Sequence, residues 1–154
     1  GAEGAKALAD ALASGRAVLT SLNLQSNNIR KDGAIAIANA LKSGTAVLTN
    51  LDLSSNDLAG ETEYINASEV EGDSKEVGAT VMYQGREMTV SQGIDDDGEL
   101  KLADYSGVHA LAGALKFNAV LTKLDVRFNI GLGDEGKKAL GDAARGRECF
   151  ELLI

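Results

Sequence analysis

The feature that most constrains the fold is a short pattern that occurs three times along the chain. The copies are Leu19–Ile29 (LTSLNLQSNNI), Leu48–Leu58 (LTNLDLSSNDL) and Leu121–Leu132 (LTKLDVRFNIGL), and the first two are offset by 29 residues. Each copy reads L-x-x-L-x-[LV]-x-x-N, so residues such as Leu22 and Leu24 are two apart and share one face of a short strand. A pattern that returns at a fixed period predicts a repeat architecture.

A second pattern lies between the strands. In the segment GAIAIANALKSG, which starts at Gly33, the apolar residues follow the i, i+3, i+4, i+7 spacing of an amphipathic helix: Ala34, Ile37, Ala38 and Leu41. Residues 4–15 repeat this spacing, and residues 134–144 predict a further helix. The small side chains on this stripe allow neighbouring helices to pack closely. The chain therefore alternates strands and helices, which predicts an α/β fold.

Three asparagines hold one position of the repeat. They are Asn27, Asn56 and Asn129, each near the end of its copy of the pattern. A buried amide there can satisfy backbone groups that a sharp turn leaves unpaired. We expect these residues to be structural.

The strand and helix patterns resemble the leucine-rich repeats of ribonuclease inhibitor and of the sensor regions of NOD-like receptors. The resemblance covers residues 1–58 and 107–148. It implies a leucine-rich-repeat solenoid, a horseshoe fragment with strands on the concave face and helices on the convex face. Residues 1–16 would be the helix of a repeat that lacks its strand, and Cys149–Ile154 (CFELLI) a terminal strand. From these ends we expect a longer parent protein or end-to-end association.

An insertion interrupts the second repeat. The step from Ile29 to Gly33 is four residues, whereas the equivalent step from Leu58 to Gly107 is 49 residues. Residues 79–90 predict a hairpin around Gln84-Gly85, residues 99–103 predict a third strand, and residues 60–76 predict an exposed loop. This β-rich element loosely resembles an SH3- or Tudor-like barrel. The expected domains are residues 1–58, 59–106 and 107–154.

The acidic charge of the chain is concentrated in the insertion. The net charge is −8, but residues 59–106 carry 12 acidic and 3 basic residues, so the remainder is nearly neutral. An acidic surface disfavours nucleic acid and anionic membranes as partners and favours a basic protein partner or a divalent cation. The alternative is that these charges only keep the insertion solvated.

Two motifs suggest a small ligand. Residues 131–136 (GLGDEG) spell the dinucleotide fingerprint G-x-G-x-x-G, but Gly136 holds the same repeat position as Gly33, so the glycines fit a repeat turn with Asp134 as a helix cap. We expect no nucleotide and no other cofactor. Clustered carboxylates suit a hard cation, so the weak metal candidates are Asp95, Asp96 and Asp97, and the alternative is an acidic turn.

No pattern supports catalysis. His109 and Cys149 are the only residues of their types and fall in different repeats, so a nucleophile pair and a structural zinc site are both disfavoured. We expect a protein that is not an enzyme. The lone cysteine excludes an internal disulfide and, with no signal-like start or long apolar run, favours an intracellular, cytoplasmic location.

The residues that alternate with the core leucines would form the binding surface on the concave side. The candidates for partner contact are Asn23, Gln25, Asp52, Ser54, Lys123, Asp125, Arg127 and the aromatic Phe128. The leading hypothesis is a scaffold that binds a protein through these strands, the acidic insertion or both. The alternative is a structural segment of a longer array, which self-associates through its ends and carries a functionally neutral insertion.

Overall fold

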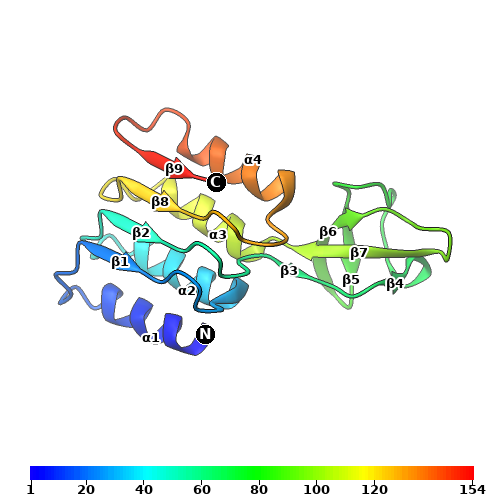
Figure 1. The fold of residues 1–154 in the computed structure, drawn as a ribbon, viewed down its shortest axis with the longest axis horizontal. Coiled ribbons are helices and arrows are strands. Elements are labelled where there is room, and N and C mark those ends of the chain that lie inside the picture. The colour runs from blue at the N-terminus through cyan, green and yellow to red at the C-terminus, as the bar shows by residue number, and fades with distance from the viewer.

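The computed structural model describes residues 1–154, which form two lobes with separate β-sheets (Figure 1). One sheet has four parallel strands and the other has five antiparallel strands. In chain order the elements are α1 (Ala2–Ala13), β1 (Ser21–Asn23), α2 (Arg30–Lys42), β2 (Asn50–Asp52), β3 (Gly60–Glu61), β4 (Ile65–Asn66), the 3₁₀ turn η1 (Ala67–Glu69), β5 (Thr80–Tyr83), β6 (Arg86–Gln92), β7 (Glu99–Asp104), α3 (Ser106–Leu115), β8 (Lys123–Asp125), α4 (Gly133–Ala144) and β9 (Glu151–Leu153). No helix combines the length and the apolar character needed to cross a membrane.

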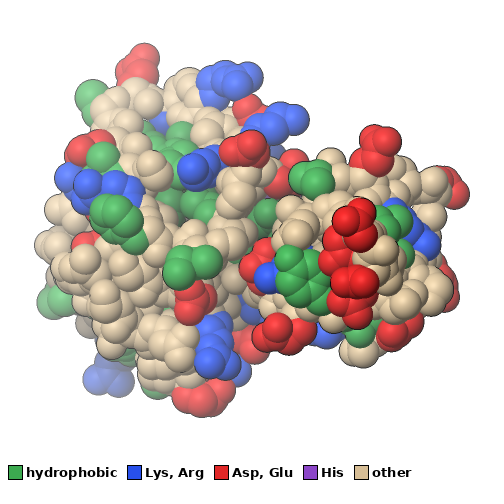
Figure 2. Space-filling view, turned by 45° about the vertical axis from the view of Figure 1, so that its right-hand side comes forward, with side chains coloured by type: hydrophobic (Ala, Val, Ile, Leu, Met, Phe, Trp, Pro, Cys, Tyr) green, Lys and Arg blue, Asp and Glu red, His purple; other side chains and the backbone are tan.

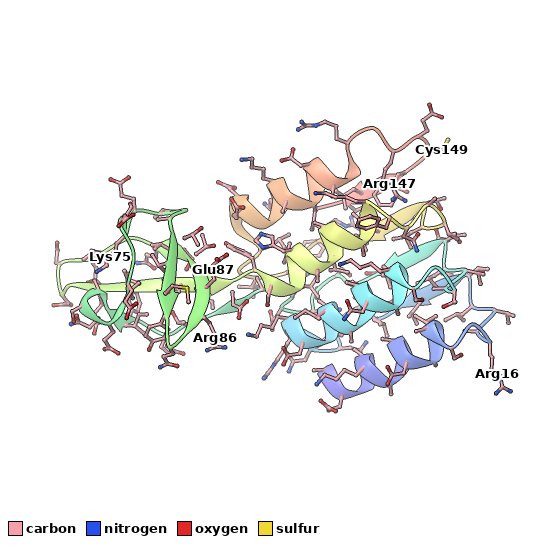
Figure 3. All side chains as sticks on the ribbon, turned by 180° about the vertical axis from the view of Figure 1, so that it is seen from behind. Arg16, Lys75, Arg86, Glu87, Arg147 and Cys149 are labelled. Atoms are coloured by element: carbon pink, nitrogen blue, oxygen red, sulfur yellow. The ribbon has the colours of Figure 1, made fainter.

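The parallel sheet has the strand order β1-β2-β8-β9. Its register aligns Leu22, Leu51, Leu124 and Leu152 across the four strands. The four helices pack in sequence order, α1 on α2, α2 on α3 and α3 on α4, and all lie behind the sheet in Figure 1 and in front of it in Figure 3. Strands therefore form one surface of this lobe and helices the other.

The main core lies between this sheet and its helices. The predicted helix stripe is buried, since Ala34, Ile37 and Ala38 are inaccessible to solvent and Leu41 is 1% exposed. The inward leucines of β2 and β8 meet this stripe in one cluster of 28 buried residues. The strand and helix periodicities of the sequence identified these buried faces, because each places its apolar side chains on one side of its element.

Glycine lets adjacent helices approach one another at their first turns. A methyl group on Gly33 would lie 2.9 Å from the Ala5 Cβ of α1, and one on Gly107 would lie 2.8 Å from the Lys31 Cα of α2. These distances are shorter than any normal carbon contact. Glycine at this repeat position is therefore required by packing.

Two of the three asparagines, Asn56 and Asn129, form a ladder of side-chain hydrogen bonds through the repeats. Asn56 Oδ1 accepts from the backbone N–H groups of Asn27 (2.8 Å) and Ile29 (3.3 Å). Asn129 Oδ1 accepts from those of Asn56 (2.9 Å) and Leu58 (3.3 Å). Each side chain thus satisfies buried backbone groups of the preceding repeat. Asn27 lies at the open edge and is exposed.

The second sheet is built from residues 60–104 and has the order β3-β7-β6-β5, with β4 also paired to β7. The predicted hairpin is present: Tyr83 pairs with Arg86, and both turn residues, Gln84 and Gly85, have positive φ as a type I′ turn requires. A separate cluster of seven buried residues forms the core of this sheet: Ala67, Val70, Val81, Met88, Val90, Leu100 and Leu102.

The expectation of a plain loop over residues 60–76 is wrong. This segment contains β3, β4 and η1, and Ala67 and Val70 within it are buried. Two-residue strands are too short to show a periodic pattern, and their pairing with β7 is decided by the tertiary fold.

The two lobes are joined where the chain leaves and re-enters the repeats. Gly60 of β3 pairs with Asp104 of β7, so both crossings run side by side. The Lys31 ammonium of α2 forms an ion pair with the Asp104 carboxylate, whose other oxygen accepts from the Ser106 N–H at 3.1 Å. One aspartate therefore links the insertion to the first turns of two repeat helices.

The chain after α4 is held by Arg147. Its guanidinium donates to the backbone carbonyls of Leu115, Asn118 (2.5 Å) and Leu121 (2.7 Å), and lies over the Phe150 ring. These bonds tie the last segment to the turn between α3 and β8, on the side of the molecule opposite the insertion (Figure 3). The terminal strand β9 then pairs with β8, where a strand was expected.

Candidate functional site

A row of polar side chains covers the strand surface of the parallel sheet. The register places Asn23, Asp52 and Asp125 beside one another, and it places Asn50 beside Lys123. Together with neighbouring backbone they line a shallow depression of about 260 Å³, formed by Ser21, Leu22, Asn23, Asn50, Leu51, Asp52, Lys123 and Asp125. We call this set the strand face. It brings together four of the eight predicted contact residues.

Strands β1, β2 and β8 each end in the same hydrogen bond, which the side chain of the last strand residue accepts from a backbone N–H group two residues later. Oδ1 of Asn23 accepts from the N–H of Gln25 at 2.9 Å, and Oδ1 of Asp52 accepts from that of Ser54 at 2.9 Å. Oδ1 of Asp125 likewise accepts from the N–H of the residue two positions later, at 3.0 Å. These side chains therefore have a structural task that the sequence analysis did not assign to them. The i to i+2 spacing of a polar residue after each core leucine is the signal that was available.

The prediction of Ser54 as a contact residue is wrong. Ser54 is 2% exposed, and its hydroxyl donates to Oδ1 of Asp52 at 2.7 Å. The strand has ended by this position, so strict alternation no longer decides which way the side chain points. Gln25, the equivalent residue of the first repeat, is exposed.

Asp125 and Arg127 form a two-pronged ion pair. Nε of Arg127 donates to Oδ1 of Asp125 at 3.0 Å and Nη2 donates to Oδ2 at 2.6 Å. Hydrogen bonding by Arg127 lowers the pKa of Asp125 below its ordinary value, although burial of the carboxyl acts in the opposite direction. The Asp125 side chain is only 8% exposed, whereas that of Arg127 is 48% exposed. Of this pair, Arg127 presents the accessible charge.

Phe128 lies beyond this pair in a conformation that bulky residues rarely adopt. Its φ is 58°, and the equivalent residues of the other repeats, Ser26 and Ser55, have φ of 57° and 56°. Its side chain is 75% exposed, so core packing does not explain an aromatic residue there. With Arg127 and Ile154 it lines a second depression of about 360 Å³. Strained exposed residues of this kind occur at functional sites.

The glycines of the dinucleotide-like motif serve local packing. Gly131 and Gly133 have positive φ, of 81° and 52°, and a methyl group on Gly133 would lie 2.6 Å from the Tyr105 hydroxyl. The prediction that Asp134 caps the helix is wrong, because α4 begins at Gly133 and no side chain caps it. Asp134 and Glu135 instead fill its first turn, where their charges would repel a phosphate.

The aspartates at residues 95–97 form a turn. Oδ1 of Asp95 accepts from the N–H groups of Asp97 (3.1 Å) and Glu99 (2.9 Å). No group of three or more His, Cys, Asp or Glu side chains is arranged to hold a metal ion. The hydrogen bonds of Asp95 agree with the acidic-turn interpretation, and Figure 2 shows acidic side chains gathered on the projecting lobe.

The two residues weighed as a nucleophile pair have separate surroundings. Nε2 of His109 on α3 lies 4.0 Å from the Glu135 carboxylate of α4. Cys149 is exposed and precedes the terminal strand. Neither environment brings a thiol and an imidazole together.

Comparison with known protein families agrees with the repeat geometry. A family model described as a leucine-rich repeat matches residues 17–38, which span β1 and most of α2, and residues 117–141, which span β8 and most of α4. The chain contains leucine-rich repeats. No curated protein matches the sequence. The repeat between the two matched segments consists of β2 and α3, which the insertion separates.

Alongside these leucine-rich repeats lies a cleft that the sequence analysis missed. It has a volume of about 610 Å³ and lies between the insertion and the start of α4. Its polar lining comes from residues far apart in the chain, including Glu61, Tyr105 and Glu135. No sequence pattern signals it, because it exists only through the relative placement of the two lobes.

Proposed function

We propose that the chain is a protein-interaction scaffold that binds a partner protein through the strand face and the adjoining Arg127 and Phe128. Leucine-rich repeats commonly serve this role. The observation that carries the proposal is Phe128, an exposed aromatic held in a left-handed conformation beside the half-exposed charge of Arg127. Aromatic and arginine side chains are enriched among the residues that dominate binding energy.

The form of the proposed scaffold is a short ribonuclease-inhibitor-like solenoid with its strands on the concave side. Its support is the parallel register with an offset of 29 residues between β1 and β2, and the single layer of helices behind the sheet. We further propose residues 59–106 as a separate SH3- or Tudor-like domain between repeat segments 1–58 and 107–154. Its own sheet and its own buried cluster support that division.

The decisive experiment compares two matched aromatic substitutions. Phe128 and Phe117 are 75% and 78% exposed, but only Phe128 lies beside Arg127, which pairs with Asp125 of the strand face. Immobilised wild-type protein, Phe128→Ser and Phe117→Ser would each be used to capture partners from a lysate of the source organism. We expect a partner held by wild type and by Phe117→Ser to be lost, by about tenfold or more, with Phe128→Ser. Equal capture by both variants would refute the proposed surface.

A second candidate function is self-association through the ends of the array. Strand β1 is an edge strand of the parallel sheet, and Leu8 of α1 and Leu19, two residues before β1, are 39% and 43% exposed. Unpaired edges are templates for further strand pairing. Light scattering at increasing protein concentration tests this role, and a Leu19→Lys variant should lower any concentration-dependent mass. A constant monomer mass for the wild type would rule it out.

A further inference from the structure

The cleft between the two lobes has an acidic lining. Glu61 comes from β3, and Asp134 and Glu135 come from the first turn of α4, whereas Lys138 is the only basic residue in the lining. Figure 2 shows acidic side chains beside the boundary of the two lobes. Charge of one sign between two low-dielectric walls concentrates the field in the space between them. The cleft is therefore suited to a cation.

At the base of the cleft is the hydroxyl group of Tyr105. Tyr105 is only 7% exposed, it lines the cleft, and none of the hydrogen bonds within the protein involves its hydroxyl. Burial raises the pKa of Tyr105, and the charges of Glu135, Glu61 and Asp134 raise it further. The hydroxyl consequently stays neutral and keeps free acceptor capacity.

Gly133 and the neighbouring ion pair hold this arrangement open. Gly133 leaves room for the Tyr105 hydroxyl, because any side chain there would start 2.6 Å from it. The Lys31–Asp104 pair fixes the crossing strands immediately before Tyr105. The cleft is thus shaped by the fold and needs no ligand to form.

Apolar groups complete the lining. Val77 is 68% exposed and offers an apolar contact surface, whereas Val90 of β6, also in the lining, is only 1% exposed. An arginine side chain has an aliphatic stem that packs on such groups and a planar head with five N–H donors for carboxylate and hydroxyl acceptors. Phosphate, nucleic acid and anionic lipid would all be repelled, and no three or more His, Cys, Asp or Glu side chains are grouped so as to hold a metal ion.

We propose that the inter-lobe cleft is a docking site for an arginine side chain of a partner protein, with Glu61 and Glu135 pairing with the guanidinium and the Tyr105 hydroxyl accepting a hydrogen bond. This site is distinct from the strand face, so it stands or falls independently of the function proposed above.

The test uses a defined probe with the intact chain. The peptide acetyl-Gly-Gly-Arg-Gly-Gly-amide would be titrated into ¹⁵N-labelled protein at low salt, with the citrulline peptide, which has the same shape without charge, as the ligand control. We expect the arginine peptide to shift the amide signals of Gly131, Gly133 and Ser91, and the citrulline peptide to leave them unchanged. Shifts confined to residues 95–97, or equal shifts with citrulline, would overturn the proposal.

Charge-matched variants separate a site from general attraction. Glu61→Gln with Glu135→Gln removes two cleft charges, and Asp73→Asn with Asp96→Asn removes two exposed charges elsewhere on the insertion. We expect the first pair to weaken binding about tenfold and the second to change it less than about twofold. Tyr105→Phe, which keeps the ring packing, should weaken it a few-fold. Equal losses from the two double variants would overturn the proposal, and the spectra themselves report whether each variant is folded.

Discussion

The side chain of Asn129 accepts a hydrogen bond from the backbone N–H of Asn56 at 2.9 Å, across 73 residues of sequence. Asn56 does the same for Asn27 in the preceding repeat. The side chain of Asn56 therefore supports the backbone of the preceding repeat, while its own N–H is held by the following one. The insertion lies between Asn56 and Asn129 in the chain, yet it does not interrupt this ladder.

Replacing a buried member of the ladder should be costly. In Asn56→Ala, the N–H groups of Asn27 and Ile29 and the carbonyls of Leu24 and Ser54 lose their side-chain partners. We expect the free energy of unfolding to fall by about 2–4 kcal/mol in urea denaturation, because buried unpaired polar groups cost about 1–3 kcal/mol each.

The control for this prediction is Asn27→Ala. Asn27 is exposed, and its amide nitrogen donates only to the carbonyl of Gln25. The loss should be no more than about 0.5 kcal/mol, which is typical of exposed positions. A similar loss at both positions would show that the ladder is not what stabilises the repeats.

Phe128→Ser should stabilise the protein. Serine is present at the equivalent positions Ser26 and Ser55, and the left-handed conformation costs a residue with a Cβ about 1–2 kcal/mol, least for short polar side chains. Thermal unfolding should move upward by a few degrees. Phe117→Ser, at an equally exposed aromatic, should leave the midpoint within about one degree. A lower midpoint for Phe128→Ser would mean that the aromatic ring supports the fold.

Gly133→Ala should be destabilising and should be rescued by a second change. The added methyl meets the Tyr105 hydroxyl at 2.6 Å, and the φ of 52° is unfavourable for alanine. We expect a loss of about 2 kcal/mol, of which Tyr105→Phe in the double variant restores a measurable part by removing the oxygen. Gly141→Ala is the matched control, because nothing lies within 4 Å and its helix should gain about 0.5–1 kcal/mol. Strict additivity of the two changes would contradict the close approach.

Protonation of two aspartates, Asp104 and Asp125, should lower the free energy of unfolding in acid. Burial raises the pKa of Asp104, but hydrogen bonds from Lys31 and Ser106 outweigh it and leave that pKa below its ordinary value. The pKa of Asp125 is lowered through Arg127. For a carboxyl whose pKa is lower in the folded state, the unfolded state binds more protons. Its contribution is therefore complete above the unfolded value, about 3.9, and is lost as the pH falls through the lower folded value.

The measurement is the urea midpoint between about pH 6 and pH 2. We expect it to decline below about pH 4 in wild type. The decline should be shallower in Asp104→Asn and in Asp125→Asn, because each variant lacks one carboxyl group whose protonation favours the unfolded state. Asp73→Asn, an exposed position outside any ion pair, should follow the wild type. An identical acid profile in all four proteins would contradict the assignment.

Several predictions from the sequence were confirmed because they depend on local periodicity. The spacing of Leu22 and Leu24 identified a strand, and that of Ala34, Ile37 and Leu41 identified a helix face. The shared position of the asparagines indicated a structural role, and Asn56 and Asn129 do bond buried backbone groups. The turn at Gln84-Gly85 was equally local, since two residues decide its geometry.

Other features were missed or wrongly predicted because their partners lie far away in the chain. Ser54 is buried because the strand ends before it and its hydroxyl donates a hydrogen bond to the Asp52 carboxylate. Residues 60–61 and 65–66 are strands only because β7, about forty residues later, pairs with them. The left-handed conformation of Phe128 follows from its repeat position, although its residue type suggests otherwise.

By itself the sequence determined the alternation of strands and helices, the repeat that stacks them, and the position at which the repeat is interrupted. These properties depend on residues that are close together in the sequence, since side-chain direction repeats every two residues in a strand and every 3.6 residues in a helix. Only the tertiary structure decided that Tyr105, Glu61 and Glu135 meet around one cleft. Their proximity depends on how the Lys31–Asp104 ion pair holds the projecting lobe. Contacts between residues far apart in the chain produce no periodic sequence pattern.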